Sequence, residues 1–226
     1  AWGDYRTTDF DIYLQRIDVD GNKLWGDDVR VNDSSIMPYY PEGPTLAADG
    51  GGGVFVVWQQ KNWGSGDAGD ICAQRLDSSG NKLWAEDVRI NSDIGNTHQH
   101  QPALVVDECG NAIVVWSDYR SENIYQIYAQ KLDGSGSRLW KPDVRVNAEE
   151  PSDYDYLHLP SIATEPVRGE TLVTWDDGSD VYAQRLDRNG NRLWTSDARV
   201  NSETVELQQD SCVILDQDGI AFVAWT

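Results

Sequence analysis

Hydrophobic and polar positions along the chain follow the pattern of short β-strands. Runs of apolar and β-branched residues, such as Val54 to Trp58 and Ala112 to Trp116, end in clusters of Asp, Ser, Gly and Asn. No segment keeps the periodicity of an amphipathic helix. Several runs are apolar on both faces, which suits sheets that pack between neighbouring sheets. The pattern therefore predicts an all-β chain of stacked sheets.

One hairpin pattern occurs four times, for example as ICAQRLDSSGNKLWAEDVRIN from Ile71. Each copy combines a β-prone run, a tight turn of Asp, Ser, Gly and Asn, and a second strand that starts at Leu-Trp. The tryptophans of these Leu-Trp pairs are Trp25, Trp84, Trp140 and Trp194. They are 59, 56 and 54 residues apart, so the repeat is 54 to 59 residues long. A repeat of this length indicates a tandem architecture.

A second hairpin, for example PALVVDECGNAIVVW from Pro102, fills the gaps between copies of the first. Its closing tryptophans are Trp58, Trp116, Trp175 and Trp225. Two hairpins give four antiparallel strands per repeat, which we name A, B, C and D in chain order. Four-stranded sheets in tandem are typical of β-propeller blades. The sequence therefore predicts a β-propeller, with the tryptophans as blade packing, because a structural unit needs the same residue in every copy.

The chain begins in a strand B, runs through three whole repeats and ends after strands A and B, which predicts seventeen strands. This phase divides the chain into the blade parts 1–40, 41–98, 99–156, 157–206 and 207–226. Because both ends fall inside a motif, we expect an excerpt of a larger ring of about six to eight blades. The alternative is a closed four-bladed ring in which the terminal strands complete the first blade.

Antiparallel alternation places the A–B and C–D turns at one end of the blades and the B–C and D–A loops at the other. The turns are short and alike, whereas the loops differ in every repeat. The loop end carries all three histidines and most of the aromatic residues outside the repeat, namely Tyr39, Tyr40, Trp63, His98, His100, Tyr154, Tyr156 and His158. Such residues stack on sugar rings or anchor protein contacts, although packing within their own loops explains them equally well. We predict that this end is the binding face.

Composition indicates a secreted or cell-surface protein. The net charge of −20 argues against nucleic acid and anionic membrane surfaces as partners. No apolar run approaches the roughly 20 residues of a membrane helix, so membrane insertion is not expected. The three cysteines, Cys72, Cys109 and Cys212, show no disulfide or metal-binding spacing. We interpret Cys72 and Cys212 as small strand residues and Cys109 as an exposed turn residue.

The sequence offers little catalytic chemistry. The A strands are expected nearest the axis, and their inward positions are Thr45, Ala47, Ala103, Val105, Ser161, Ala163, Cys212 and Ile214. No Arg, His or carboxylate recurs there, so the channel lacks the acid/base pair that hydrolysis needs. The charges that do recur, Asp28/Arg30, Asp87/Arg89, Asp143/Arg145 and Asp197/Arg199, share a face of strand D and are interpreted as structural. We therefore predict no catalytic residues and no enzymatic activity.

Two parts of the sequence, the histidines of the loop end and one acidic turn, contain residue types that bind metal ions. The histidines of the loop end could meet at a metal ion. The turn Asp18, Asp20 and Asn22 resembles the start of a calcium loop but lacks its later ligands, so it predicts at most a weak calcium site. In the alternative, Asp and Asn at these turns bond their own backbone. No other cofactor is expected.

The motifs YAQRLD, SGN, LW and DVRVN, followed by PALVVD, GN and VVWSDYR, resemble tandem repeats of large secreted or cell-surface bacterial proteins. The C–D hairpin is also similar to the tryptophan-docking repeat of quinoprotein propellers, with a Trp four residues after the turn glycine, as in Gly80 and Trp84. Here the aspartate comes three residues before the glycine, one closer than in that family. The hairpin loosely resembles the Asp-box of sialidases, with different spacings. Neither family's catalytic residues can be placed on this sequence.

These observations predict a non-catalytic extracellular module with a structural or interaction role, which binds protein or glycan through its variable loops. The alternative is the propeller domain of a carbohydrate-active, sialidase-like enzyme whose catalytic residues lie in the loops or outside this segment. The two differ in one observable feature. An enzyme should carry a buried carboxylate pair in a pocket at the loop end.

Overall fold

A computed structural model describes residues 1–6, 10–33, 39–62, 69–93, 97–121, 124–149, 157–202 and 207–226, without the side chains of Tyr39, Tyr40, Asn62, Ser121 and His158. In these residues the chain forms seventeen strands and no helix, in the order predicted. All strand pairs are antiparallel. We number the five sheets blade 1 to blade 5 in chain order.

Blade 1 is β1-β2-β3 (Trp2–Asp4, Asp11–Leu14, Val29–Arg30). Blade 2 is β4-β5-β6-β7 (Tyr39–Ala48, Val54–Asn62, Gly69–Leu76, Val88–Arg89). Blade 3 comprises β8 to β11 (Gln99–Val106, Ala112–Ser121, Ile124–Leu132, Val144–Arg145). Blade 4 is β12-β13-β14-β15 (His158–Glu165, Glu170–Asp176, Val181–Leu186, Ala198–Arg199), and blade 5 is β16-β17 (Cys212–Leu215, Ala221–Ala224).

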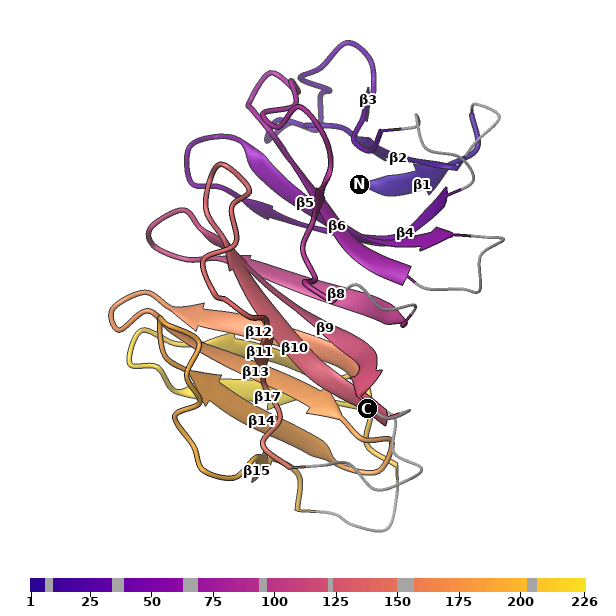
Figure 1. The fold of residues 1–226 in the computed structure, drawn as a ribbon. Coiled ribbons are helices and arrows are strands. Elements are labelled where there is room, and N and C mark those ends of the chain that lie inside the picture. The colour runs from indigo at the N-terminus through magenta and orange to yellow at the C-terminus, as the bar shows by residue number, and fades with distance from the viewer. Residues whose placement is uncertain are drawn as a thin grey trace.

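The blades stack in chain order from indigo to yellow, and the A–B turns of blades 2 to 5 project to the same side, at the left of Figure 1. Strands β4, β8, β12 and β16 form the inner edge, since each contacts the inner strand of the next blade. These are the A strands, which the sequence places nearest the axis. Their first residues therefore meet at the loop end.

The stack is not closed. Strand β16 pairs only with β17, and β2 pairs with β1 and β3, within the described part of the chain. The closed four-bladed ring would require blade 5 to pair with β2, so that alternative is wrong. Blades 2 to 4 have four strands each, as predicted.

Apolar side chains fill the space between blades. Trp58, Trp116 and Trp175, which close the B strands of blades 2 to 4, are at most 2% exposed. Trp225 of blade 5 is 40% exposed, so the packing role predicted for it is wrong in the described residues, where no following blade covers it. Phe55, Ile71 and Trp84 of blade 2 pack with Leu104 and Trp116 of blade 3 in one continuous cluster. Because each central strand is covered on both faces, its residues are apolar on both faces.

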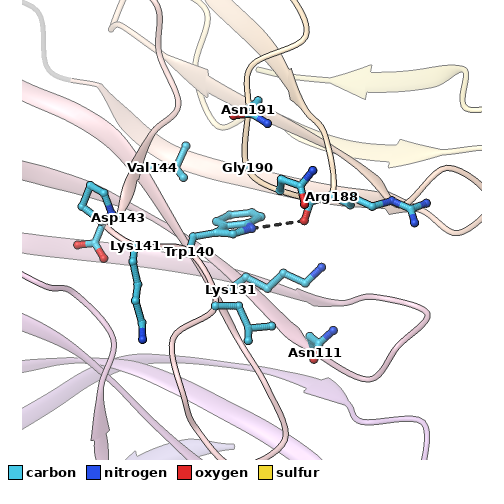
Figure 2. Close-up of a pocket in the computed structure, with 12 residues that line it drawn as sticks. Asn111, Lys131, Trp140, Lys141, Asp143, Val144, Arg188, Gly190 and Asn191 are labelled. Carbon is cyan, nitrogen blue, oxygen red and sulfur yellow. Dashed lines mark hydrogen bonds between the residues drawn. The ribbon is translucent and has the colours of Figure 1, made fainter.

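The tryptophans of strand D reach across to the following blade. The indole nitrogen of Trp84 donates to the carbonyl of Gly134 at 3.1 Å. Likewise, the indole nitrogen of Trp140 donates to the carbonyl of Arg188 at 3.4 Å, which is the dashed line in Figure 2. Trp84 and Trp140 are buried and Trp25 is half-buried, but Trp194 is 36% exposed. The burial predicted for all four is therefore wrong for Trp194, because no C–D turn of a following blade covers it in the described residues.

The recurring polar residues hold each C–D hairpin together, as blade 2 shows. Gln74 accepts from the backbone nitrogen of Trp84 at 3.3 Å and donates to Asp87 at 3.3 Å. The other oxygen of Asp87 accepts from the backbone nitrogen of Asp33 in blade 1 at 2.7 Å. Arg89 pairs with Asp70 at 2.9 Å rather than with Asp87. These charges thus fasten strand D to strand C and to the preceding blade.

Candidate functional site

Two cavities lie beside the docked tryptophans. One, of about 590 Å³, contains Trp140, Gly190, Lys131 and Arg188 (Figure 2), and another, of about 280 Å³, lies beside Trp25. Both follow from the same contact between successive blades. Because a cavity that recurs with the repeat reflects blade packing, we do not assign it a ligand.

A third cavity, of about 470 Å³, lies at the loop end of the inner strands. Its walls come from the start of four successive A strands and comprise Gly43, Gln101, Pro102, Leu159, Pro160, Ser161, Asp210 and Ser211. We call it the axial cavity. It joins blades 2 to 5 at the face that the sequence predicts for binding, so it is the candidate site.

The backbone of the axial cavity repeats from blade to blade. One residue in each of β4, β8 and β12, and one just before β16, has a positive φ, with angles of 57° for Gly43, 55° for Gln101, 44° for Leu159 and 54° for Asp210. The register of pairing to strand B shifts at this point in blades 2 to 4. Left-handed conformations cost non-glycine residues about 1 kcal/mol or more and are often found at functional sites. The side chains at this one backbone position differ in every blade, as expected of a site built on a rigid frame.

Asp176, the last residue of β13, carries an unusual carboxyl group beside this cavity. It is 1% exposed, its Oδ1 accepts from the Gly178 nitrogen at 3.2 Å, and its Oδ2 has no hydrogen-bond partner among the described residues. Burial raises the pKa of Asp176 to about 6, and the charges of Asp210 and Asp177 raise it too, against hydrogen bonds from the Gly178 and Asp210 backbone. Near neutral pH this carboxyl therefore exchanges a proton readily.

Asp176 and Asp210 form a pair in unlike environments. The Asp210 side chain is exposed and lines the axial cavity, whereas Asp176 lies behind it and bonds to its backbone. Two neighbouring carboxyl groups whose surroundings differ are a common arrangement for acid/base chemistry. Of the two, only Asp176 is buried, so the structure places one buried and one exposed carboxyl at the loop end, where the enzyme alternative predicts a buried pair.

Hydroxyl groups fix the wall next to this pair. Ser211 Oγ donates to Thr174 Oγ1 at 3.1 Å, and Ser161 Oγ accepts from the Val213 nitrogen at 3.2 Å. Thr174 is fully buried and Ser211 is 6% exposed. These bonds join blades 4 and 5, so the segment that carries Asp210 is held in place.

Asp176 and Asp210 were not among the predicted site residues, because the search for catalytic residues considered only charges that recur in every repeat. Asp176 follows Trp175 where the other blades have Gly3, Gln59 and Ser117. Asp210 and Ser211 occupy the position of Gln101 and Pro102. The sequence feature that could have identified the pair is that both residues depart from the repeat, at positions that lie close together in the fold.

Two of the predicted histidines, His98 and His100, lie in an aromatic cluster at the loop end of blade 3. The rings of His100 and Tyr125 are 4.8 Å apart, those of Tyr119 and Tyr125 are 4.7 Å apart, and those of His98 and Tyr119 are 6.3 Å apart. All four side chains are half-buried. Tyr119 and Tyr125 were not predicted, although they lie in the variable loop sequence SDYRSENIYQ.

The remaining predicted residues cannot be placed fully. Trp63, Tyr154 and Tyr156 lie outside the described residues, and the structure gives only the backbone of Tyr39, Tyr40 and His158. The backbone of His158 pairs with that of Asp176 at the start of β12. No three His, Cys, Asp or Glu side chains that the structure describes are arranged to hold a metal ion.

The turn predicted for calcium bonds to itself. Asp18 Oδ1 accepts from the backbone nitrogens of Asp20 and Asn22 at 2.9 and 2.8 Å, and Oδ2 accepts from the Asn22 side chain at 3.0 Å. The Asn22 side chain, followed by the backbone bonds, lowers the pKa of Asp18. Equivalent bonds occur at Asp77 and Asp187. The calcium site stays a prediction, and the self-bonded alternative accounts for these contacts.

The three cysteines differ in burial. Cys72 is partly buried, and burial raises its pKa, while Cys109 and Cys212 are exposed. Cys212 was expected inside a strand, and β16 contains it, but its face is uncovered. In the part of the chain that the structure describes, no helix has the length and apolar character to cross a bilayer.

The fold of the chain is similar to that of several solved structures. No family model and no curated protein sequence matches the chain. It is similar to the Hadza microbial sialidase Hz136 (12% identity, TM-score 0.60, 96% of this chain and 46% of that one). It is also similar to a Penicillium chrysogenum alpha-L-arabinanase (14%, 0.59, 95% and 66%) and to the GH93 alpha-L-arabinofuranosidase of Fusarium graminearum (14%, 0.58, 95% and 66%). The chain spans about half to two thirds of these proteins.

These comparisons contradict the prediction of a non-catalytic interaction module with no enzymatic activity. The solved structures that share the fold are enzymes acting on glycosides, so that prediction is wrong, and the carbohydrate-active alternative is the better supported. At 12 to 14% identity the likeness establishes the fold, a β-propeller of antiparallel sheets. The activity of this chain must be argued from its own residues.

Proposed function

We propose that this chain is part of a carbohydrate-active propeller in which the axial cavity binds a sugar unit and supplies the proton for cleavage of a glycosidic bond. The observation that carries the proposal is the Asp176 and Asp210 pair. One carboxyl is buried with its pKa raised to about 6, and the other lines a cavity at the loop end. The similarity to glycoside-processing propellers adds support from the fold.

Glycoside hydrolysis uses one carboxyl group that protonates the leaving oxygen and another on the far side of the sugar. Asp210 makes the contact with the sugar in this proposal because its side chain lines the cavity. Asp176 is a positioning residue, whose buried carboxyl lies behind Asp210 and accepts a hydrogen bond from its backbone. No other carboxyl lines the axial cavity among the described side chains. The proposal therefore assigns to this chain the acid half of the reaction.

The proposal extends to architecture and location. The outermost sheets, blade 1 and blade 5, do not pair in the described residues, which supports a ring larger than five blades. A ring of about six to eight blades is the usual range. A secreted or surface-bound protein, with repeats like those of bacterial surface proteins, suits an enzyme that acts on external glycans. The proposal includes a protein at the cell surface as a further partner of the loop end.

The test is glycan binding and hydrolysis by the intact chain. Isothermal titration with arabino-oligosaccharides and release of aryl arabinofuranosides should both respond to Asp210→Asn, with at least about a tenfold loss. Asp216→Asn is the matched control, because Asp216 lies in the A–B turn of blade 5, at the opposite end of the same strand. If Asp210→Asn binds and cleaves as the parent does, or the parent binds none of these glycans, the proposal is wrong.

A further inference from the structure

The charges around the axial cavity restrict the sugar that it can hold. Its described walls contain one carboxylate, Asp210, and no Lys, Arg or His. The nearby cations at the loop end are already paired. Arg120 Nη2 lies 3.0 Å from Asp143 and also contacts Asp118, and Lys61 pairs with Glu42 at 2.5 Å. With a net charge of −20 on the chain, an anionic sugar would meet repulsion with no fixed cation to offset it.

The aromatic cluster of blade 3 begins where the axial cavity ends. His100 directly precedes Gln101, which lines the cavity and accepts from the Leu159 nitrogen at 3.1 Å. The rings of His98, Tyr119, Tyr125 and His100 are in contact in that order, and every one of them is half-buried, so part of each remains accessible. We call these four residues the ring platform. Aromatic faces with polar edges suit the apolar faces and hydroxyls of sugars.

A comparison of blade 1 with blade 3 distinguishes the rings that pack a blade from the rings that are available to bind a ligand. Blade 1 carries an equivalent pair, Tyr5 and Phe10, with ring centres 4.6 Å apart. That pair shows that two rings at this hairpin can serve the blade alone. Histidines at the positions of His98 and His100 together occur only in blade 3. They extend the ring surface toward the cavity, which the repeat does not require.

We propose that the site takes a neutral oligosaccharide, with one sugar unit in the axial cavity and the next units stacked on the ring platform. The inference rests on the proposed function for the first unit only. The described walls offer no fixed cation to bind a sialic-acid carboxylate, even though one similar fold is a sialidase. The platform sets the direction in which the chain of sugars leaves the cavity, outward over blade 3.

The experiment measures affinity against chain length by isothermal titration. The probes are arabino-oligosaccharides of one to five units and sialyllactose. For the parent, affinity should rise about tenfold or more from one unit to three, equivalent to about 1.4 kcal/mol. Sialyllactose should bind at least about tenfold more weakly than a neutral trisaccharide. Tyr125→Ala should remove the gain with length and leave the single-unit affinity unchanged.

Matched variants keep the outcome decisive. Tyr5→Ala removes the equivalent ring of blade 1 and should not alter the length dependence. His100→Gln removes a platform ring and keeps a polar side chain. It replaces Tyr125→Ala in the test if Tyr125→Ala lowers the melting temperature substantially. Equal affinity for all lengths in the parent, equal losses from Tyr5→Ala and Tyr125→Ala, or tighter binding of sialyllactose would overturn the inference. A full effect of Tyr125→Ala on length dependence alongside an unaffected Asp210→Asn would instead overturn only the proposed function.

Discussion

The indole of Trp140 in blade 3 rests directly on Gly190 in blade 4. A Cβ atom built on Gly190 would stand 3.0 Å from Trp140 Cδ2 and 2.8 Å from a methyl group of Val144. The same relationship holds between Trp84 and Gly136, where the nearest ring atom is at 3.1 Å. Successive blades are thus joined by an aromatic ring that fits only over a turn without a side chain. This contact explains why Gly and Trp recur together.

Substitution of the turn glycine should therefore cost more where a ring lies on it. Gly190 and Gly21 have nearly equal φ, +86° and +83°, but nothing lies within 4 Å of a Cβ built on Gly21 among the described residues. We expect Gly21→Ala to cost about 1 kcal/mol for the left-handed conformation alone. Gly190→Ala should cost about 2 kcal/mol more, because the ring or the turn must move. Urea unfolding of the two variants gives the comparison, and equal losses would contradict the docking contact.

Truncation of the docking ring itself should depend on the blade. Trp84 is 7% exposed and Trp194 is 36% exposed. We expect Trp84→Ala to lower the free energy of unfolding by about 3 to 5 kcal/mol, as for other large buried aromatics. Trp194→Ala should cost about 1 kcal/mol, because its ring has less to lose. Chemical denaturation measures both, and a Trp194→Ala loss as large as that of Trp84→Ala would show that the exposed ring is packed in solution.

Calcium should leave the melting temperature unchanged. The carboxylate of Asp18 already accepts three hydrogen bonds from its own turn. A tightly bound ion would raise apparent stability by mass action, so excess chelator and added calcium should give the same calorimetric melting curve. A calcium-dependent rise that Asp18→Asn removes would instead establish the weak site that the turn sequence predicts.

The repeat made the fold predictable. Four copies of a hairpin show which residues form turns and which face is buried, so strand order and the antiparallel alternation could be predicted. The exposure of Trp194 could not be predicted from the repeat in the same way. Recurrence predicts that Trp140 and Trp194 are equivalent, whereas burial depends on the turn that the next blade supplies.

The candidate site was less predictable for a related reason. The positive φ of Gln101 and Leu159 has no local signal beyond the proline that follows each of them. Asp176 and Asp210 are 34 positions apart in the sequence and meet only because the last residue of β13 and the segment that leads into β16 lie at the same end of neighbouring blades. A search for recurring charges does not find either residue, because the residues that line the axial cavity differ from blade to blade.

Asp176 should weaken the fold near neutral pH while serving the site. Its pKa is raised from the ordinary 3.8 to about 6, so between these values the folded chain holds a proton that the unfolded chain releases. The stability that this proton provides is therefore complete below about pH 4 and is lost as pH rises through about 6.

Asp176→Asn removes the ionisable group and with it this loss. We expect the variant to be more stable than the parent by about 1 to 3 kcal/mol at pH 7, with the difference vanishing below about pH 4. Glycoside cleavage should fall at the same time, because the pair no longer carries a mobile proton, so stability and activity move in opposite directions. Denaturation at several pH values, with Asp216→Asn as the reference, measures the first effect. A variant that is less stable than the parent at pH 7, with the parent's pH dependence intact, would show that Asp176 is ionised and satisfied in the folded protein.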